Sequence, residues 1–276
     1  MRLTSIPSEA DDLLPAARHA LSASLSDLEH LYVAFSGGAD SAFLTAAAVE
    51  ALGAGRVTAV TAISPSLPSI EHADCAAFTA ELGLRWIEVD TDEMEQAAYR
   101  RNDGDRCFWC KDALMRALEP IVGDGGTVAL GVNVDDLGEH RPGQRAAAEA
   151  GAVFPLVEAG FTKAMVREAS RRMGLRTWDK PAAACLASRI PYGTAVSVAV
   201  LGRVERAERA LRAMGFDELR VRHYDDTARI EVPTSRLTEV AERAEEVADA
   251  VSACGYRYVT LDLQGLRTGN LNQALA

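Results

Sequence analysis

The sequence contains no long apolar run. No stretch reaches the roughly 20 apolar residues that a membrane-spanning helix needs, and residues 1–15 carry early acidic residues without the apolar core of a signal peptide. Apolar residues are still numerous enough for a core, because 48% of the 276 residues are hydrophobic. We therefore expect a globular cytoplasmic protein that does not contact a membrane.

Basic residues are outnumbered by acidic ones. Lys and Arg total 29 and Asp and Glu total 40, which gives a formal net charge of −11 at pH 7. A protein that binds a polyanion usually presents a basic surface, because the release of counterions from the phosphates drives association. The charge therefore argues against nucleic acid as a partner.

Two familiar phosphate-binding motifs are absent as well. The sequence has neither a loop ending in Gly-Lys-Ser/Thr nor the spaced G-x-G-x-x-G of dinucleotide-binding folds. Instead, a strand-like segment at 32–35 leads through Ser36-Gly37-Gly38 into a helical pattern that begins at Asp40-Ser41. Backbone N–H groups at a helix N-terminus bind anions, and the hydroxyl groups of Ser36 and Ser41 add donors. The pattern predicts an anion-binding loop, with an ordinary glycine-rich turn as the alternative.

Strand-like and helical segments alternate after this loop. The strand-like segments span residues 56–63, 85–90 and 127–133, and the helical ones span 69–83 and 112–122. This alternation is typical of βαβ units, so it predicts an α/β fold with a parallel sheet whose ligands bind at the carboxyl ends of the strands.

Polar residues follow the strand predicted near residue 130. Gly131, Asn133, Asp135 and Asp136 come directly after apolar residues. We expect them at the same edge of the sheet as the anion-binding loop, within reach of the same nucleotide. An Asn/Asp-rich turn is the alternative interpretation.

The pattern changes from about residue 196. An amphipathic helix is predicted over 196–215, a β-hairpin over 218–233 with its turn at 225–227, a second helix over 237–255, and a strand over 256–263. Period two places four residues together on the hairpin face opposite Leu219 and Val221, namely Arg220, Arg222, Arg229 and Glu231. We predict domains at 1–195 and 196–276, since Pro191 and Gly193 interrupt the pattern at the boundary.

The sequence has only five cysteines, an odd number that does not suit a disulfide framework. Cys75 and Cys254 lie in apolar helical patterns and are predicted to be packed thiols. Cys107 and Cys110 form a C-x-x-C pair, and Cys185 follows much later.

The C-x-x-C pair has several possible uses. A thioredoxin-like pair would stand at a helix N-terminus directly after a strand, whereas this pair follows a polar stretch. A zinc site would need four ligands, and no second pair follows. Three cysteines suit an iron–sulfur cluster that leaves one iron open to an exogenous ligand.

Several motifs together resemble known families. S-G-G-x-D-S at 36–41 resembles the pyrophosphate loop (PP-loop) of the ATP pyrophosphatase superfamily. The whole set is similar to the LarE family and comprises that loop, R-C-x-x-C-K, G-x-N-x-D-D, HRPG, WDKPAAACLASRIPYG, RVRHYDDTARIEV and LDLQGLRTGNLN. The similarity spans residues 31 to about 272. It implies a PP-loop domain, of the adenine nucleotide alpha hydrolase type, followed by a smaller α/β domain for substrate binding and oligomerisation.

The LarE resemblance implies an activity. Members of this family use ATP to adenylate a carboxylate of pyridinium-3,5-biscarboxylic acid mononucleotide and replace it by a thiocarboxylate, in the synthesis of the nickel-pincer cofactor of lactate racemase. The implied cofactors are ATP and Mg²⁺, and similar proteins form homo-oligomers. The residues expected to bind ATP and Mg²⁺ are Ser36, Gly37, Gly38, Asp40, Ser41, Gly131, Asn133 and Asp136.

Substrate and sulfur chemistry are expected around Cys185. Ser188 and Arg189 follow Cys185 closely enough to hold an anionic substrate near its sulfur. The expected catalytic residues are Asp40, Cys185, Ser188 and Arg189, and the resemblance adds substrate contacts from Glu208, Arg220, Arg222 and Arg267. Alternatively, Glu208 pairs with Arg212 within its helix, and the strand arginines face solvent.

Two sulfur sources occur in the LarE family. Some members sacrifice the thiol that matches Cys185, and others hold a 4Fe-4S cluster with three cysteines. Since the three matching cysteines are present, we predict a cluster on Cys107, Cys110 and Cys185. The alternative is that Cys185 acts alone and that the other two are packing thiols beside Phe108 and Trp109.

Other functions are possible from the residues alone. PP-loop enzymes that thiolate tRNA also combine the loop with a C-x-x-C and a later cysteine, but the acidic charge argues against that substrate. An amidotransferase-type synthetase would leave the three cysteines unexplained. A nucleotide-binding regulatory protein would bind ATP without releasing pyrophosphate.

Overall fold

The computed structural model describes residues 9–138, 142–181 and 184–267. These residues form two compact units, which are described separately. The first unit contains the described residues of Met1–Ser64, Ser69–Thr91 and Cys107–Ala183, and the second those of Pro65–Pro68, Asp92–Arg106 and Ala184–Ala276. The predicted domains at 1–195 and 196–276 would have to fold independently of each other, and this boundary stays a prediction.

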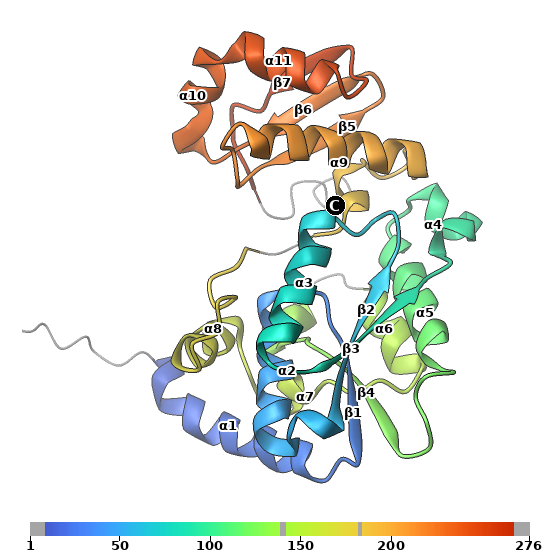
Figure 1. Ribbon diagram of the computed structural model, residues 1–276, viewed down its shortest axis with the longest axis vertical. Coiled ribbons are helices and arrows are strands. Elements are labelled where there is room, and N and C mark those ends of the chain that lie inside the picture. Colours follow the sequence, from blue (N-terminus) through green and yellow to red (C-terminus); the bar gives the residue numbers. More distant parts are fainter. Residues whose placement is uncertain (1–8, 139–141, 182–183, 268–276) are drawn as a thin grey trace, which may run out of the picture. The chain divides into compact units, whose positions relative to one another are not determined.

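The first unit contains a four-stranded parallel sheet (Figure 1). Its strands are β1 (His30–Ala34), β2 (Val57–Ile63), β3 (Arg85–Asp90) and β4 (Gly126–Leu130), in the order β3-β2-β1-β4. Ala34 at the end of β1 is level with Val60 of β2 and with Leu130 of β4. The predicted α/β fold is therefore confirmed, and the loops after β1 and β4 leave the sheet at the same edge.

Helices cover both faces of this sheet. They are α1 (Glu9–Ser26), α2 (Ala39–Leu52), α3 (Ser69–Glu81), α5 (Arg106–Leu118), α6 (Pro142–Glu149), α7 (Pro155–Glu158) and α8 (Lys163–Arg172). Val33 packs with residues of α1, α2 and α8, whereas its neighbour Ala34 packs with residues of α5 and α6. Successive side chains of a buried strand point to opposite faces, so both faces of the sheet need a helical layer.

The second unit contains a three-stranded mixed sheet. Its strands are β5 (Arg220–Tyr224), β6 (Thr227–Glu231) and β7 (Tyr258–Leu261), and its helices are α4 (Ala97–Arg101), α9 (Val198–Ala213), α10 (Leu237–Glu242) and α11 (Ala244–Ser252). β5 and β6 form the predicted hairpin, with Asp225 in the left-handed region at φ 50°. Arg222 lies opposite Arg229 in this register. Val221 and Ile230 are buried on the other face, as the alternation predicts.

Two sequence predictions about helices are wrong. The single helix predicted over 237–255 is divided at Arg243, whose ψ of 29° leaves helical geometry. Its guanidinium donates to the carbonyl oxygen of Met214 at 2.9 Å and lies over the ring of Phe216, so a tertiary contact overrides the local pattern. The helix predicted from residue 112 begins at Arg106, so Cys107 and Cys110 lie in its first two turns rather than before it.

No helix in the described ranges combines the length and the apolar character that crossing a membrane requires.

Candidate active site

The loop between β1 and α2 has the geometry of an anion cradle. Gly37 adopts φ +70°, which glycine reaches without strain. The Oγ of Ser41 accepts the N–H of Ser36 at 3.3 Å and donates to the carbonyl oxygen of Gly38 at 3.1 Å. Gly38 is the N-cap of α2 and no side chain caps it. The first N–H groups of this helix are therefore available to an anion.

Two glycines of the site make close approaches possible. A Cβ on Gly37 would lie 2.8 Å from the Sγ of Cys75, which is fully buried in α3. A Cβ on Gly131 would lie 2.6 Å from the backbone nitrogen of Ser41. Gly131 thus allows the end of β4 to approach the start of α2, a packing role that sequence reasoning did not assign to it.

Asp40 is the centre of a polar network in the first unit. Its two carboxylate oxygens accept hydrogen bonds from Asn133 Nδ2 at 3.1 Å and from Lys163 Nζ at 2.5 Å. The Asn133 backbone N–H donates to Asp136, and the Lys163 backbone N–H donates to Asp135. The structure therefore brings Asp40 and Asn133 together, while Asp135 and Asp136 also fix the turn, as the alternative interpretation held.

Lys163 was missed by sequence reasoning. It is the first residue of α8, after the N-cap Thr162, whose side chain accepts from the backbone N–H of Met165. Nothing local links it to Asp40, which lies 123 positions earlier in the chain. A Thr-Lys pair that opens a helix was the available signal, and it is a weak one.

Lys180 is a second cation that the sequence did not reveal. Its Nζ donates to the carbonyl oxygen of Gly37 at 3.0 Å, to Glu71 at 2.7 Å, and to Asp74. Burial alone would lower the pKa of Lys180, but its hydrogen bonds to these carboxylates outweigh burial and raise the pKa. Lys180 therefore stays charged and holds the loop between β1 and α2 against α3.

Cys75 lies beneath the same loop. Burial raises the pKa of its thiol to about 11. A thiol with such a pKa carries almost no thiolate at neutral pH. The prediction that Cys75 is a packed thiol is confirmed.

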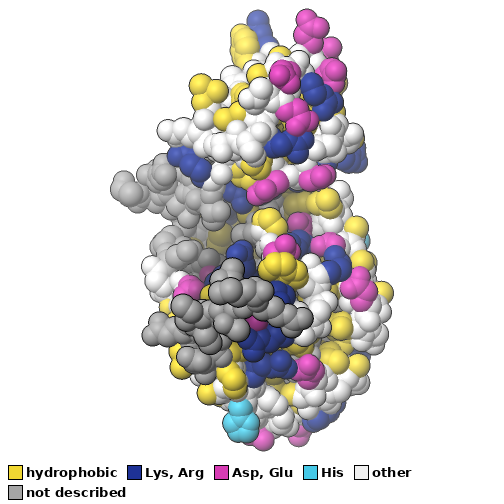
Figure 2. Space-filling model, turned by 90° about the vertical axis from the view of Figure 1, so that its left-hand side faces the viewer, with side chains coloured by type: hydrophobic (Ala, Val, Ile, Leu, Met, Phe, Trp, Pro, Cys, Tyr) yellow, Lys and Arg dark blue, Asp and Glu magenta, His cyan; other side chains and the backbone are white. Residues whose placement is uncertain are grey.

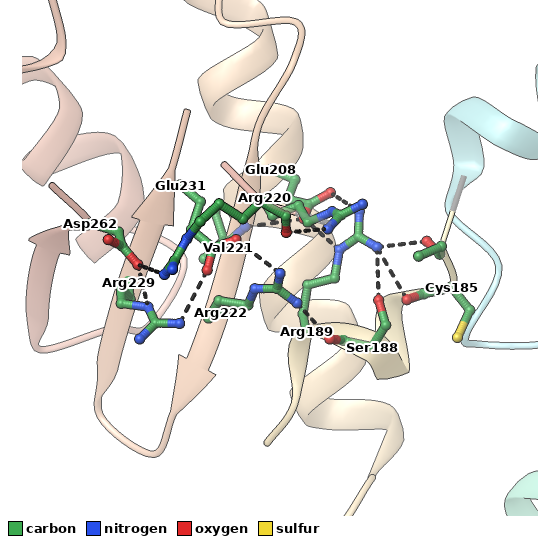
Figure 3. Close-up of polar contacts among 12 residues, drawn as sticks. Cys185, Ser188, Arg189, Glu208, Arg220, Val221, Arg222, Arg229, Glu231 and Asp262 are labelled. Atoms are coloured by element: carbon green, nitrogen blue, oxygen red, sulfur yellow. Dashed lines mark hydrogen bonds and ion pairs between the residues drawn. The ribbon is translucent and has the colours of Figure 1, made fainter. Parts of the chain in front are cut away.

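In the second unit, Arg189 organises the segment that follows Cys185. Cys185 is the N-cap of a short 3₁₀ helix, Leu186–Arg189. The guanidinium of Arg189 donates to the carbonyl oxygens of Ala184 at 2.6 Å and Cys185 at 3.2 Å, and to Ser188 Oγ at 3.1 Å. The sulfur of Cys185 points away from this guanidinium (Figure 3).

Glu208 holds the other side of Arg189. Its carboxylate accepts from Arg189 Nε at 2.8 Å, from Arg212, and from the backbone N–H of Val221 at 3.1 Å. Burial alone would raise the pKa of Glu208, but Arg189 and Arg212 outweigh it and the pKa lies below its ordinary value. The predicted helix pair with Arg212 does exist, and Arg189 completes it as a buried bridge.

An arginine cluster surrounds this bridge, and we define it as Arg189, Arg220, Arg222, Arg229 and Arg267. Arg222 is only 2% exposed, so the alternative that it faces solvent is wrong. Arg222 donates to the carbonyl oxygen of Ser188 at 2.8 Å and to Glu231 at 2.9 Å. Glu231 also pairs with Arg229, which Asp262 approaches as well (Figure 3). Asp262 also lies 3.9 Å from Arg267.

Arg220 is the least neutralised member of the cluster. It donates to the carbonyl oxygen of Arg267 at 3.4 Å and, within the described residues, forms no ion pair. Burial and the neighbouring charges of Arg189 and Arg222 lower its pKa. A half-buried guanidinium beside other guanidinium groups favours the binding of an anion.

The three cysteines predicted to hold a cluster are divided between the units. Cys107 is exposed and Cys110 partly exposed, one turn apart on α5 in the first unit, and Cys185 is partly exposed in the second. In the described part of the chain no group of three or more His, Cys, Asp or Glu side chains is arranged to hold a metal ion. Their convergence therefore stays a prediction. His140 and Arg141 of the HRPG motif lie outside the described residues.

The fold and the loop define the class of protein. Residues 22–111 match the family model described as NAD synthase. The parallel sheet and the glycine loop at the start of α2 are consistent with this match, and together they are those of a PP-loop domain like that of NAD synthase.

Relatives extend over nearly the whole chain. An uncharacterised protein of Synechocystis sp. is 40% identical over 253 residues, which are 90% of this chain and 94% of that protein. The pyridinium-3,5-bisthiocarboxylic acid mononucleotide synthase of Lactiplantibacillus plantarum is 36% identical over 264 residues, 95% of this chain and 96% of the synthase. An uncharacterised protein of Methanocaldococcus jannaschii is 26% identical over 245 residues, 86% of this chain and 91% of that protein. This chain belongs to the family of the synthase, the LarE family, and is an enzyme.

Proposed function

We propose that this enzyme is an ATP-dependent sulfurtransferase. It adenylates a carboxylate of pyridinium-3,5-biscarboxylic acid mononucleotide and converts it into a thiocarboxylate, a step in the synthesis of the nickel-pincer cofactor. The family membership supports this substrate. The observation that carries the proposal is the arginine cluster, whose Arg189 is bonded to the backbone beside Cys185. The second unit therefore combines a nucleophilic thiol with positive charge for an anionic substrate.

ATP activates the carboxylate in the first unit. A carboxylate resists attack by sulfur because its oxygens are negatively charged, and an acyl-adenylate supplies a good leaving group. The open N–H groups of the loop and the ammonium group of Lys163 stabilise the departing pyrophosphate. Asp40 offers the carboxylate ligand that Mg²⁺ prefers, and Mg²⁺ would neutralise phosphate charge there.

Substrate binding belongs to the second unit. Arg220 and Arg267 are suited to hold the phosphate and the carboxylates of the mononucleotide, because Arg267 is partly exposed and Arg220 has no carboxylate partner in the described residues. Three further side chains are almost fully buried, namely those of Arg189, Arg222 and Glu208. Arg189 donates to Glu208, and Arg222 donates to the carbonyl oxygen of Ser188. We assign to these three the task of fixing Cys185 and Ser188 beside the substrate.

Sulfur is delivered at Cys185. We propose that Cys107, Cys110 and Cys185 hold a 4Fe-4S cluster, which supplies a sulfide when bound. The donors fit in kind, since all three thiols are at least partly exposed whereas Cys75 is fully buried. Chain connectivity supports the arrangement, because Arg106 contacts the backbone of Ala187 at 2.8 Å and directly precedes Cys107.

Anaerobic reconstitution with iron and sulfide tests the sulfur source. The proposal expects about four irons per chain, as a cluster requires, and repeated turnover with added sulfide. Cys107→Ala should lose the iron, and the control Cys254→Ala should keep it. A protein that binds no iron, and in which Cys185 loses the mass of H₂S for each product formed, would instead establish the sacrificial thiol.

A tRNA substrate is the alternative, and it needs a separate assay. On the face of the molecule shown in Figure 2, acidic and basic side chains of the described residues are interspersed rather than segregated. Such a surface offers little for a polyanion. Binding of tRNA that weakens with salt, together with its ATP-dependent thiolation, would favour the alternative.

We also propose that the enzyme is cytoplasmic and forms a homo-oligomer. Sedimentation of the purified protein would test its oligomeric state.

A further inference from the structure

Asn102 is bonded to the turn that follows the Cys185 segment. It ends α4 in the left-handed conformation, with φ 59° and ψ 43°, and it is fully buried. Its Nδ2 approaches the carbonyl oxygens of Pro191 at 2.8 Å, Thr194 at 2.9 Å and Ile190 at 3.3 Å. The main-chain carbonyl oxygen of Asn102 accepts the N–H of Gly193. One buried carboxamide thereby fixes the backbone of residues 190–194.

Arg106 extends this contact to the other end of the segment. Its Nη1 donates to Asn102 Oδ1 at 2.6 Å and to the carbonyl oxygen of Ala187 at 2.8 Å, and the side chain is buried. Its guanidinium also lies 5.7 Å from the ring centre of Tyr192. Ala187 stands between Cys185 and Ser188, so this arginine holds the backbone between the sulfur and the predicted substrate contacts.

The cost of burying Arg106 argues for a specific role. A guanidinium taken out of water is expensive unless its donors are satisfied, and here it is bonded to a main-chain carbonyl oxygen and a carboxamide. A rigid backbone at residues 186–194 matters most where reacting atoms must meet, because displacement by about 1 Å can reduce a rate about a hundredfold.

We propose that Asn102 and Arg106 are positioning residues that hold the backbone of residues 185–194, the Cys185 segment, in place for sulfur transfer. This inference rests on the proposed function. In the step concerned, an electron pair of sulfur forms the C–S bond, the C–O bond of the acyl-adenylate breaks, and AMP leaves with that bond's electron pair; with hydrosulfide as the sulfur source, the proton goes to solvent. When the segment is loosened, water competes with sulfur for the acyl-adenylate, and pyrophosphate is released without thiocarboxylate.

The test compares three variants. Asn102→Gly removes the carboxamide but tolerates the left-handed backbone, and Arg106→Gln removes the charged donor. Arg101→Gln is the matched control, because Arg101 is exposed at the end of α4, next to Asn102, and pairs only with Asp103 among the contacts described for it. Reconstituted protein receives ATP, the pyridinium mononucleotide and sulfide, and thiocarboxylate is measured per pyrophosphate released.

We expect this ratio to fall about tenfold or more in Arg106→Gln and Asn102→Gly, as the loss of a charge-assisted hydrogen bond implies. Arg101→Gln should keep the wild-type ratio. A merely structural role would lower both products together and leave the ratio unchanged, which would overturn the inference. Should Arg106→Gln fail to fold by circular dichroism, Asn102→Gly decides alone, and a wild-type ratio in that variant also overturns the inference.

A second readout needs no turnover. Hydrogen exchange of protein without iron or ATP should become faster at residues 186–194 in Asn102→Gly and Arg106→Gln, and not in Arg101→Gln. Unchanged exchange there overturns the inference. If wild-type protein forms neither pyrophosphate nor thiocarboxylate, the proposed function fails, and the exchange result alone decides whether these residues position the segment.

Discussion

Replacing Gly37 by alanine tests the pyrophosphate loop without removing a polar group. Gly37 has φ +70°, and a Cβ there would lie 2.8 Å from the Sγ of Cys75. Cys75 has no room to move, since it is fully buried in a cluster with Phe35 and Phe78. The substitution therefore introduces two separate penalties, one in the backbone and one in packing.

The two penalties have different magnitudes and different remedies. A residue with a Cβ in the left-handed region costs about 1–2 kcal/mol, and overpacking a core costs about 1–3 kcal/mol more. We expect Gly37→Ala to lower the free energy of unfolding by about 2–5 kcal/mol in total. In a Cys75→Ala background the packing penalty disappears, so Gly37→Ala should then cost only about 1–2 kcal/mol.

Tryptophan fluorescence is the suitable assay. All three tryptophans, Trp86, Trp109 and Trp178, belong to the first unit, so urea unfolding monitored through them reports on that unit. Gly53→Ala is the matched control, because Gly53 has φ +79° and its Cβ would meet no atom within 4 Å. Equal losses for Gly37→Ala with and without the Cys75 sulfur would refute the packing argument.

Three further predictions follow from the site. Asp40→Ala should abolish ATP-dependent pyrophosphate release with an unchanged circular dichroism spectrum, because Lys163 and Asn133 lose their shared partner; undiminished release would contradict this role. Arg220→Ala should raise the apparent KM for the pyridinium mononucleotide about tenfold and the KM for ATP little, since a charge-assisted hydrogen bond contributes about 1.5–3 kcal/mol; equal shifts would place Arg220 elsewhere. Burial would raise the pKa of Glu208, but Arg189 and Arg212 hold it below the ordinary 4.5. The contribution of the ionised Glu208 to stability is therefore complete above pH 4.5 and is lost as the pH falls through the depressed pKa. Glu208→Gln should be less stable than wild type at pH 7, and its free energy of unfolding should depend less on pH below 4.5. Parallel pH curves for the two proteins would count against the buried bridge.

Local patterns were sufficient for the strands. The four strands of the parallel sheet follow from short runs of β-branched and other apolar residues, because both faces of that sheet are buried. The hairpin of β5 and β6 follows from period two and from the Asp225-Asp226 turn. The break at Arg243 could not be foreseen, since it depends on contacts with Met214 and Phe216.

The candidate site was predictable only where its residues lie close together in the sequence and form a motif. The loop at Gly37 and the segment after Cys185 carry their own signals. Lys163 and Lys180 meet the loop through contacts across 123 and 143 positions, and no local pattern records such pairs. Arg189 was expected to grip the substrate, whereas in the structure its guanidinium is bonded to Glu208 and to the backbone beside Cys185.

In the proposed function, one enzyme couples ATP cleavage to the replacement of oxygen by sulfur in a pyridinium carboxylate. The most direct test incubates the anaerobically reconstituted protein with ATP, Mg²⁺, sulfide and pyridinium-3,5-biscarboxylic acid mononucleotide, and measures pyrophosphate together with the mass of the nucleotide product. We expect pyrophosphate to appear only when the mononucleotide is present, and the product to gain about 16 mass units for each oxygen replaced by sulfur as its acyl-adenylate is consumed. Pyrophosphate release without the mononucleotide, or a nucleotide of unchanged mass after ATP is consumed by the wild-type protein, would contradict the proposed function.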